Sequence, residues 1–264
     1  HRVRVLSTEL SPPSAWLAPV LSDAEALVVV GGDGAVRLVA ETAMRCDVPL
    51  WVHPQGTENL FARTYGMSRR RSRLRAALAG EGERRVDVGR VNGEVFLIMT
   101  SAGYDADVVH DVSEARRGGI SHLAYLWPCL RRWWRWSPVS AEAWMDGVSV
   151  SCPGRGWVLA ANAPSYAAGL NPSWRSDPSD GLVELSYLEL SDRWSLARRM
   201  VTYLVGGQRR DGCLRLYSGR RLEVRFASPR RVQVDGDPLG GVGVEHSGLV
   251  VEVESGGLRL LGGG

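Results

Sequence analysis

Two short polar stretches each follow an apolar run, and their residue types suit the binding of an anion. The first is GGDG at residues 31–34, directly after the run LVVV. Glycines let backbone N–H groups approach a phosphate closely, and the start of a following helix adds a favourable dipole. Asp33 would repel a phosphate, so it suits a metal, a metal-bound water or a ribose hydroxyl. The alternative is a tight turn in which Asp33 caps a helix.

The second polar stretch is GTEN at residues 56–59, directly after the apolar run VPLWVHPQ. Thr57 can donate a hydrogen bond to phosphate, and Asn59 can hold a loop or a ligand. Arg63 suits a catalytic role or an ion pair on a helix surface. In open α/β folds, ligands bind at the edge where the carboxyl ends of parallel strands meet. We therefore expect both stretches to form one site.

The elements that carry these stretches alternate between strand and helix over residues 27–79. Short β-branched runs precede each polar stretch, and apolar residues at helical spacing follow the first of them. This alternation predicts a parallel α/β unit. The opening HRVRVLS alternates apolar and polar residues, which predicts another strand over residues 1–7.

From about residue 86 the pattern changes to short strands separated by Gly, Pro and Asp turns. It predicts a second, mostly antiparallel domain with helices near 113–136 and 191–206. The predicted boundary gives an α/β domain over residues 1–88 and a β-sandwich domain over 89–264, with a C-terminal tail that can return to the first.

Bulk composition narrows the function further. The net charge is only +3, and all 32 basic residues are arginine. The chain therefore has no lysine for a Walker-type phosphate contact or a Schiff base. The cysteines are far apart without a CxxC pair, which argues against zinc and disulfides and favours a reducing cytoplasm. No apolar run is long enough to predict a transmembrane helix.

At this point the sequence resembles a known family, that of the diacylglycerol kinase catalytic domain, which includes sphingosine, ceramide and bacterial soluble lipid kinases. The resemblance begins with GGDGAV followed by PQGTENLFAR. It continues in order through VDVGRVNGEVFLIMTSAGYDADV, HLAYLW, LAANAPSYAAGLNPSWRSDPSDGLVELSYLE and VQVDGDPL, and runs from about residue 23 to 260.

The resemblance implies an α/β nucleotide domain and a β-sandwich lipid domain, with the active site between them. It implies an ATP site in the first domain and a magnesium site in the second. The residues carried over for ATP are Thr8, Gly31, Gly32, Asp33, Gly34, Gly56, Thr57 and Asn59.

In the segment SDPSDGLVEL the resemblance implies a structural Mg²⁺ held by oxygen atoms alone, which suits a hard cation. Asp180 would be the side-chain ligand, with the carbonyl groups of Asp177 and Leu182. Asp87 would belong to the surrounding network of magnesium and water. The alternative is an Asp-Gly turn between strands.

In VQVDGDPL the family usually has D-G-E, whose Glu is the proposed general base. Here the third position is Asp237, which retains a carboxylate shortened by one methylene group. Its reach therefore changes by roughly 1.5 Å, and a base must come within hydrogen-bond distance of its proton. The alternative for DGD is a hairpin turn.

Three departures from the family keep other functions open. Ala35 replaces a usual Thr, Leu60 replaces a usual Asp, and the family's opening strand and phosphate loop have no counterpart before HRVRVLS. One alternative is a pseudokinase that binds nucleotide or lipid without catalysis. Another is an NAD kinase-like enzyme, which shares GGDG, although GTENLFAR and VDGD argue against it.

The segment ARRGGISHLAYLWPCLRRWWRWSP at residues 115–138 mixes arginines with four tryptophans. Such a mixture favours a membrane–water interface; the alternative is that Trp127, Trp133 and Trp134 pack inside the protein. No nucleic-acid motif accompanies it.

We therefore expect an ATP- and Mg²⁺-dependent kinase of a diacylglycerol-like or sphingoid lipid in phospholipid biosynthesis. In catalysis, Asp237 would take the proton of the lipid hydroxyl, and Mg²⁺ with Asp33 would neutralise the developing charge. The enzyme would act at the cytoplasmic membrane surface, and a homodimer stays open.

Overall fold

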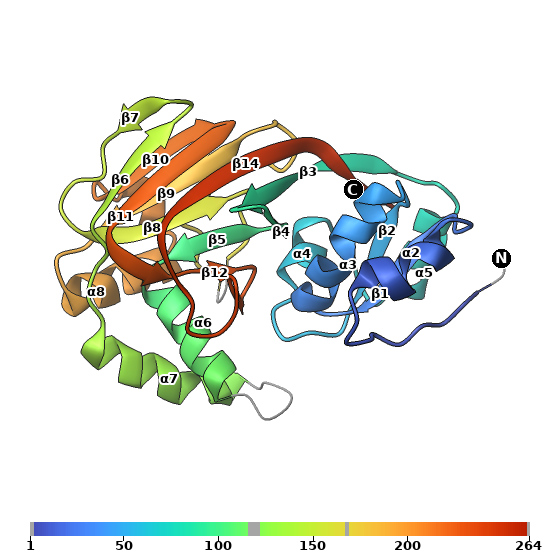
Figure 1. The fold of residues 1–264 in the computed structure, drawn as a ribbon, viewed down its shortest axis with the longest axis horizontal. Coiled ribbons are helices and arrows are strands. Elements are labelled where there is room, and N and C mark those ends of the chain that lie inside the picture. Colours follow the sequence, from blue (N-terminus) through green and yellow to red (C-terminus); the bar gives the residue numbers. More distant parts are fainter. Residues whose placement is uncertain (1–2, 116–121, 167–168, 263–264) are drawn as a thin grey trace.

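The computed structural model describes residues 3–115, 122–166 and 169–262, and places them in two lobes (Figure 1). The first lobe is built on β1 (Leu27–Gly31) and β2 (Leu50–Pro54), which pair in parallel with Gly31 opposite Pro54. Helix α3 (Asp33–Arg45) connects them. Strand β2 is buried over its first three residues, as its continuous apolar pattern requires.

Shorter helices complete the first lobe, and the predicted alternation of strand and helix is confirmed. They are α1 (Pro13–Trp16), α2 (Ala18–Leu21), α4 (Leu60–Thr64) and α5 (Arg71–Leu78). The strand predicted over residues 1–7 is wrong, because residues 3–9 have no regular secondary structure. Val3 and Val5 are 80% and 90% exposed, so their alternating pattern has no sheet to pack on.

One sheet joins the two lobes through the C-terminal strand β14 (Glu245–Leu260). Its last residue, Leu260, pairs in parallel with Leu50 of β2, so the tail returns to the first lobe as expected. Its long course across the top of both lobes is visible in Figure 1. Strand β3 (Arg84–Val91) pairs with β14 and crosses residue 88, where the domain boundary is predicted.

The order of the whole sheet is β1-β2-β14-β11-β6-β7, with β3 paired to β14 and β4 paired to β3. Its other pairs, apart from β1–β2 and β2–β14, are antiparallel. Its remaining strands are β4 (Glu94–Phe96), β6 (Ala141–Met145), β7 (Val148–Val150) and β11 (Arg221–Arg231).

A second sheet has the order β10-β9-β8-β5-β12-β13, and every pair in it is antiparallel. Its strands are β5 (Met99–Ala102), β8 (Gly156–Ala161), β9 (Val183–Glu189), β10 (Leu214–Gly219), β12 (Gln233–Val234) and β13 (Asp237–Pro238). A buried apolar cluster with Phe96, Tyr187 and Val224 draws on strands of both sheets, as in a β-sandwich. The predicted fold class is therefore confirmed.

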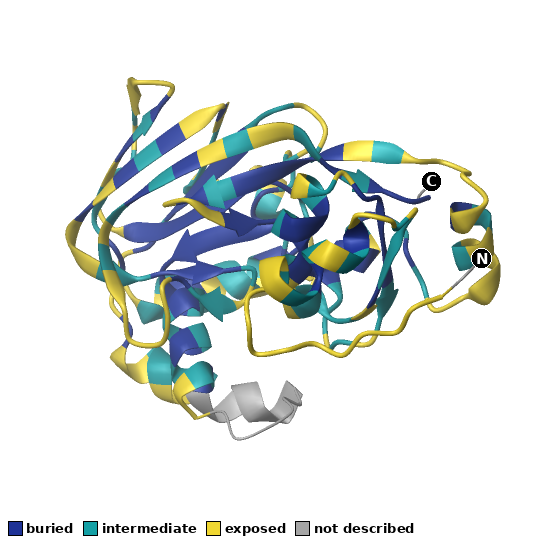
Figure 2. Cartoon of the chain, turned by 45° about the vertical axis from the view of Figure 1, so that its right-hand side comes forward, coloured by how far each residue is buried: buried dark blue, intermediate teal, exposed yellow. Residues whose placement is uncertain are grey.

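Helices of the second lobe lie below its sheets (Figures 1 and 2). They are α6 (Tyr104–Glu114), α7 (His122–Arg135), α8 (Arg193–Leu204) and the 3₁₀ turn η2 (Gly207–Arg210). Helix α6 begins nine residues before the predicted start at 113, inside a run that resembled a strand. Its buried residues Val108 and Val112 are four apart and cover the core at helical spacing. All four cysteines are free.

Candidate active site

The two polar stretches lie at one edge of the first lobe, as their positions after parallel strands predicted. Gly31 ends β1 opposite Pro54 at the end of β2, and Gln55 N donates to Gly31 O at 2.8 Å. The first loop turns at once into α3, whose N-cap is Gly32. The backbone N–H groups of the first turn of this 13-residue helix thus face the end of the sheet.

The two loops touch through their glycines. A Cβ added to Gly56 would lie 2.6 Å from the Cα of Gly32, a distance that real side chains do not tolerate. Asn59 fixes this loop, because its Oδ1 accepts from Gly56 N at 2.8 Å and its Nδ2 donates to Gly56 O at 2.7 Å. Thr57, next to Gly56, is exposed at this edge.

Asp33 connects the first loop to the second. One carboxylate oxygen accepts from Leu60 N at 3.0 Å, and the other accepts from Phe61 N at 2.9 Å. These are the first N–H groups of α4, so Asp33 does not cap its own helix, as the turn alternative supposed, but satisfies the start of the next one. The structure therefore gives Asp33 a positioning role at this edge.

Asp237 reaches the same edge from the second lobe. It begins β13, and its Oδ2 lies 3.3 Å from Nη2 of Arg37 on α3. A Cβ added to Gly34 would lie 3.7 Å from the same oxygen. The carboxylate that the sequence proposed as a base thus lies beside the glycine loop, although the two are about 200 residues apart in the chain.

A hollow of about 490 Å³ opens between these residues. It is lined by Thr8, Gly32, Gly34, Ala35, Arg37, Leu38 and Asp237. The structure thus brings four of the predicted site residues around one space, with residues of α3 that sequence reasoning had not selected. Gly31, Gly56, Thr57 and Asn59 lie in the two adjoining loops.

Asp235, which sequence reasoning missed, holds the hairpin that carries Asp237. It has a positive φ of 47°, and its carboxylate accepts from the backbone N–H groups of Leu97, Ile98 and Met99 at 2.6–2.9 Å. Burial raises its pKa to about 6, against the effect of these three bonds. Gln233 adds a further contact, because its Oε1 accepts from Gly236 N at 2.8 Å.

The residues proposed for magnesium form a compact turn around Asp87. The buried carboxylate of Asp87 accepts from Gly181 N at 2.6 Å and from Gly256 N at 2.7 Å. Asp180 Oδ1 accepts from Leu182 N at 2.9 Å. The pKa of Asp180 is raised by desolvation and then by repulsion from Asp177 and Asp87.

This oxygen-rich, negatively charged turn fits a hard cation, since a divalent ion would relieve the repulsion between its carboxylates. Within the described residues, no three His, Cys, Asp or Glu side chains form a metal cluster. A site of one carboxylate and backbone carbonyls does not need such a cluster. Glu184, four residues after Asp180, is buried, and burial raises its pKa to about 7.

The aromatic segment 115–138 lies partly outside the described residues, which leave out 116–121 and the side chains of 122–128, including Trp127. Of the other two tryptophans, Trp133 packs against the core and its Nε1 donates to Arg193 O at 3.1 Å. Trp134 is 59% exposed. The packing alternative therefore holds for Trp133 and fails for Trp134.

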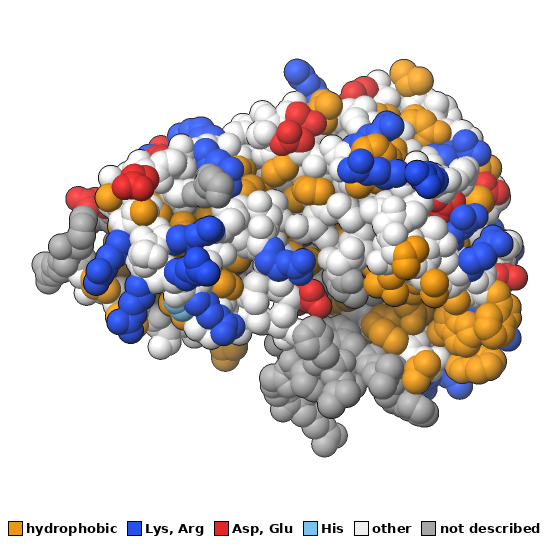
Figure 3. Space-filling view, turned by 180° about the vertical axis from the view of Figure 1, so that it is seen from behind, with side chains coloured by type: hydrophobic (Ala, Val, Ile, Leu, Met, Phe, Trp, Pro, Cys, Tyr) orange, Lys and Arg blue, Asp and Glu red, His pale blue; other side chains and the backbone are white. Residues whose placement is uncertain are grey.

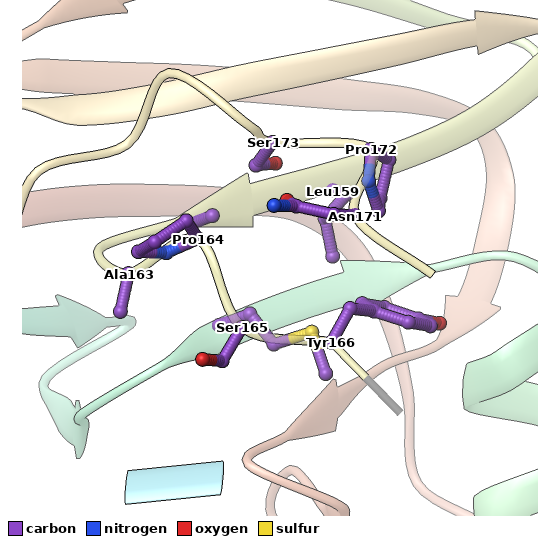
Figure 4. Close-up of a pocket in the computed structure, with 10 residues that line it drawn as sticks. Leu159, Ala163, Pro164, Ser165, Tyr166, Asn171, Pro172 and Ser173 are labelled. Atoms are coloured by element: carbon purple, nitrogen blue, oxygen red, sulfur yellow. The ribbon is translucent and has the colours of Figure 1, made fainter. Parts of the chain in front are cut away.

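A second hollow in the β-sandwich lobe is too narrow for a water molecule (Figure 4). Ser165, one of the residues that line it, forms a 2.6 Å hydrogen bond with Thr64 of α4 in the first lobe. This contact joins the two lobes on the α4 side of the candidate site.

Comparison with known proteins gives the class of the molecule. Residues 10–91 match the diacylglycerol kinase catalytic domain, and residues 98–262 match the YegS C-terminal NAD kinase beta sandwich-like domain. A "Probable lipid kinase YegS-like" protein from Pseudomonas aeruginosa is 33% identical over 224 residues, which cover 81% of this chain and 70% of that protein.

Two further likenesses agree with that match. A "Diacylglycerol kinase" from Mycobacterium tuberculosis is 27% identical over 195 residues, 72% of this chain and 63% of that protein. A crystal structure of a diacylglycerol kinase from Bacillus anthracis superimposes with a TM-score of 0.68 at 15% identity, covering 97% of this chain and 82% of that one, and so supports the fold.

The chain therefore belongs to the diacylglycerol kinase catalytic domain family, and in class it is a lipid kinase. This membership favours the lipid kinase over the NAD kinase-like alternative.

Proposed function

We propose that the protein uses ATP and Mg²⁺ to phosphorylate the hydroxyl group of a diacylglycerol-like or sphingoid lipid. The observation that carries this proposal is the position of Asp237, a carboxylate of the second lobe that lines the same hollow as Gly32 and Gly34 of the first lobe. A hydroxyl acceptor bound to one lobe and a nucleotide bound to the other would meet there.

In the proposed reaction, Asp237 accepts the proton of the lipid hydroxyl while the hydroxyl oxygen forms a bond to the γ-phosphorus of ATP. The bond from that phosphorus to the bridging oxygen breaks, and ADP leaves with the electron pair. The glycine loop and the start of α3 hold the phosphates through backbone N–H groups. Asp33 holds the second loop beside the first, and Asn59 fixes the shape of the second loop. Most catalysis in phosphoryl transfer comes from such positioning and electrostatics.

Magnesium would be held by Asp180 and by the carbonyl groups of Asp177 and Leu182, with Asp87 supporting the turn through Gly181. When bound, the ion would supply positive charge that stabilises this acidic turn. Mg²⁺ should therefore raise the melting temperature of the wild type and not that of Asp180→Asn. Asp177→Asn is the matched control, because only the backbone of Asp177 is proposed as a ligand. An equal rise in all three proteins would contradict the assignment.

The proposed function is tested by transfer of radiolabelled phosphate from ATP to diacylglycerol, ceramide, sphingosine and a polyprenol. Loss of the base in Asp237→Asn should reduce turnover by about 10²–10⁴-fold. Asp237→Glu, which restores the family's usual residue, should keep substantial activity. A wild type that labels no lipid while still binding ATP would favour the pseudokinase, and equal turnover of Asp237→Asn and wild type would exclude Asp237 as the base.

We further propose that the enzyme binds the membrane surface through what we call the α7–α8 face. No helix within the described residues is long and apolar enough to cross a membrane. Large apolar side chains instead lie exposed on α7, on α8 and just after it. They are Leu130, Trp134, Trp194, Val201, Leu204 and Val205.

The charge around this face suits anionic lipids. Helix α8 contains no acidic residue, and Arg198, Arg209 and Arg210 are exposed nearby. The guanidinium of Arg193 lies 4.8 Å from the ring centre of Trp134 and 5.9 Å from that of Trp194. The gathering of apolar and basic side chains is visible at the lower right of Figure 3. Tryptophan and arginine together favour the level of the lipid headgroups.

Co-sedimentation with vesicles tests this face. Trp134→Ser combined with Trp194→Ser should weaken binding to vesicles that contain anionic lipid by about tenfold or more, with little change in melting temperature. Trp144→Ser is a control in the second lobe, since Trp144 of β6 lies outside the face and stacks on Arg225. Unchanged vesicle binding by the double variant would contradict the proposal.

A further inference from the structure

Arg37 occupies a special place at the candidate site. It follows Asp33 by one turn of α3, and it contacts acidic residues of two other elements. Its Nη2 lies 3.3 Å from Asp237 Oδ2, and its Nη1 lies 3.7 Å from Glu94 Oε2 on β4. The side chain of Arg37 is only 21% exposed, whereas that of Asp237 is 37% exposed.

The hollow contains one charge of each sign among the described residues that line it. Arg37 is the basic one and Asp237 the acidic one. The chain has no lysine, so no lysine can neutralise a polyphosphate here. A polyphosphate in this space would be repelled by Asp237 and attracted by Arg37, and both side chains would face it at once.

We propose that Arg37 is a cation shared between Asp237 and the nucleotide. In the free enzyme it pairs with Asp237 and holds that carboxylate beside the glycine loop. When ATP binds, the guanidinium of Arg37 turns to the terminal phosphate. Asp237 is then released to accept the proton of the lipid hydroxyl. The inference rests on the proposed function and adds to it a positioning residue that couples nucleotide binding to the base.

The chemistry of the groups favours this exchange. A guanidinium has five N–H donors in a planar fork that fits phosphate oxygens in pairs. The pair with Asp237 uses one nitrogen atom at 3.3 Å, so it is not bidentate. A partly exposed pair of this kind contributes little to stability. A phosphate with more charge and more acceptor oxygens is therefore the stronger partner.

The test compares the affinities of Arg37 variants for ATP and AMP by calorimetry without lipid. Arg37→Gln should weaken ATP binding by about tenfold or more, because it removes charge-assisted bonds to phosphate. It should leave AMP binding unchanged, because AMP lacks the terminal phosphate. Arg37→Lys should restore part of the ATP affinity. Asp237→Asn should bind ATP at least as tightly as the wild type.

A second readout follows the base at limiting ATP, where the rate reports the nucleotide-free enzyme with its pair between Arg37 and Asp237. Loss of the neighbouring cation should move the acid limb of the pH–rate profile of Arg37→Gln to higher pH, since a carboxylate without a nearby cation binds its proton more tightly. Arg45→Gln is the matched control, because it makes the same change on the same helix. Arg45 does not line the hollow and pairs with Glu41 at a distance of 2.9 Å. Melting temperatures verify that all variants fold.

The outcomes separate this inference from the proposed function. If Arg37→Gln weakens the binding of ATP and of AMP equally, or weakens the binding of neither, the shared-cation role is wrong. This conclusion holds even when the wild type phosphorylates lipid. If the wild type labels no lipid but Arg37→Gln selectively loses ATP affinity, the contact of Arg37 with the terminal phosphate is supported. The proposed lipid kinase activity is then wrong. An unshifted acid limb would show that Arg37 does not act on Asp237.

Discussion

The two sides of the candidate site use the same device in different ways. In the first lobe, Asp33 precedes a glycine and accepts two backbone N–H groups from the start of α4. In the second lobe, Asp235 precedes a glycine and accepts three N–H groups from residues 97–99. Asp33 lies in the first turn of a helix, whereas Asp235 has a left-handed backbone conformation with a φ of 47°.

Both aspartates lie in conspicuous motifs, and the carboxylate of each holds a neighbouring segment through its backbone N–H groups. Asp33 and Asp235 each fix one wall of the hollow, and the carboxylate that lines it is Asp237. Asp33 accepts two backbone N–H groups and Asp235 accepts three, so loss of Asp235 should lower the stability of the protein more than loss of Asp33. Four substitutions test this, from the largest expected effect to the smallest.

Asp235→Ala should have the largest effect. It leaves three buried N–H groups, those of Leu97, Ile98 and Met99, without their acceptor. We expect a loss of about 4–5 kcal/mol in the free energy of unfolding, measured by urea denaturation. The free energy of unfolding of Asp235→Asn, which retains one acceptor oxygen, should lie between those of the wild type and Asp235→Ala. A loss below that of Asp33→Ala would overturn the ranking of the two walls.

Asp33→Ala should cost less, because only Leu60 N and Phe61 N lose their acceptor. We expect a loss of about 3 kcal/mol, together with weaker ATP binding as the two loops separate. The control is Asp47→Asn, since Asp47 is an exposed residue whose carboxylate pairs with arginines, and asparagine tolerates its φ of 50°. That change should stay within about 1 kcal/mol. If Asp33→Ala keeps wild-type stability and loses activity alone, its role is chemical and not positional.

The sequence predicted much of this arrangement, and the failures have physical causes. Asp237 beside Gly34 was anticipated because both belong to family motifs. Asp235 was missed because its partners are backbone N–H groups 136–138 residues away, and backbone donors leave no pattern in a sequence. Arg37 resembled an ordinary polar residue on a helix, since nothing local reveals that Glu94 and Asp237 approach it.

The local sequence pattern also could not predict burial where adjacent residues of the same type have different surroundings. Trp133 and Trp134 are neighbours of the same type, yet the first packs on the core and the second is exposed. The prediction of a strand in the opening segment was wrong for a related reason, because its strand-like alternation has no sheet beside it. Pattern predicts which conformation a segment favours, but the packing partner decides whether that conformation forms.

Gly56→Ala tests the contact between the loops of the first wall. Its Cβ would lie 2.6 Å from Gly32 Cα, so one backbone must move. We expect a loss of about 1–3 kcal/mol and weaker ATP binding. The matched change Gly34→Ala places a Cβ 3.7 Å from Asp237 Oδ2, an ordinary contact, and should leave stability unchanged or slightly higher. Equal losses in the two variants would show that the close approach of the loops does not matter.

Gly236→Ala should have the smallest effect and isolates the backbone of the second wall. Gly236 has a φ of 87°, and a Cβ there would meet no atom within 4 Å, so conformation alone opposes the change. We expect a loss of about 1 kcal/mol, measured as a shift of roughly 2–4 °C in melting temperature. Gly236→Asn should lose less, because asparagine tolerates a positive φ better than alanine. If alanine and asparagine lose equally, strain is not the cause, and the bond from Gly236 N to Gln233 Oε1 is the next feature to test.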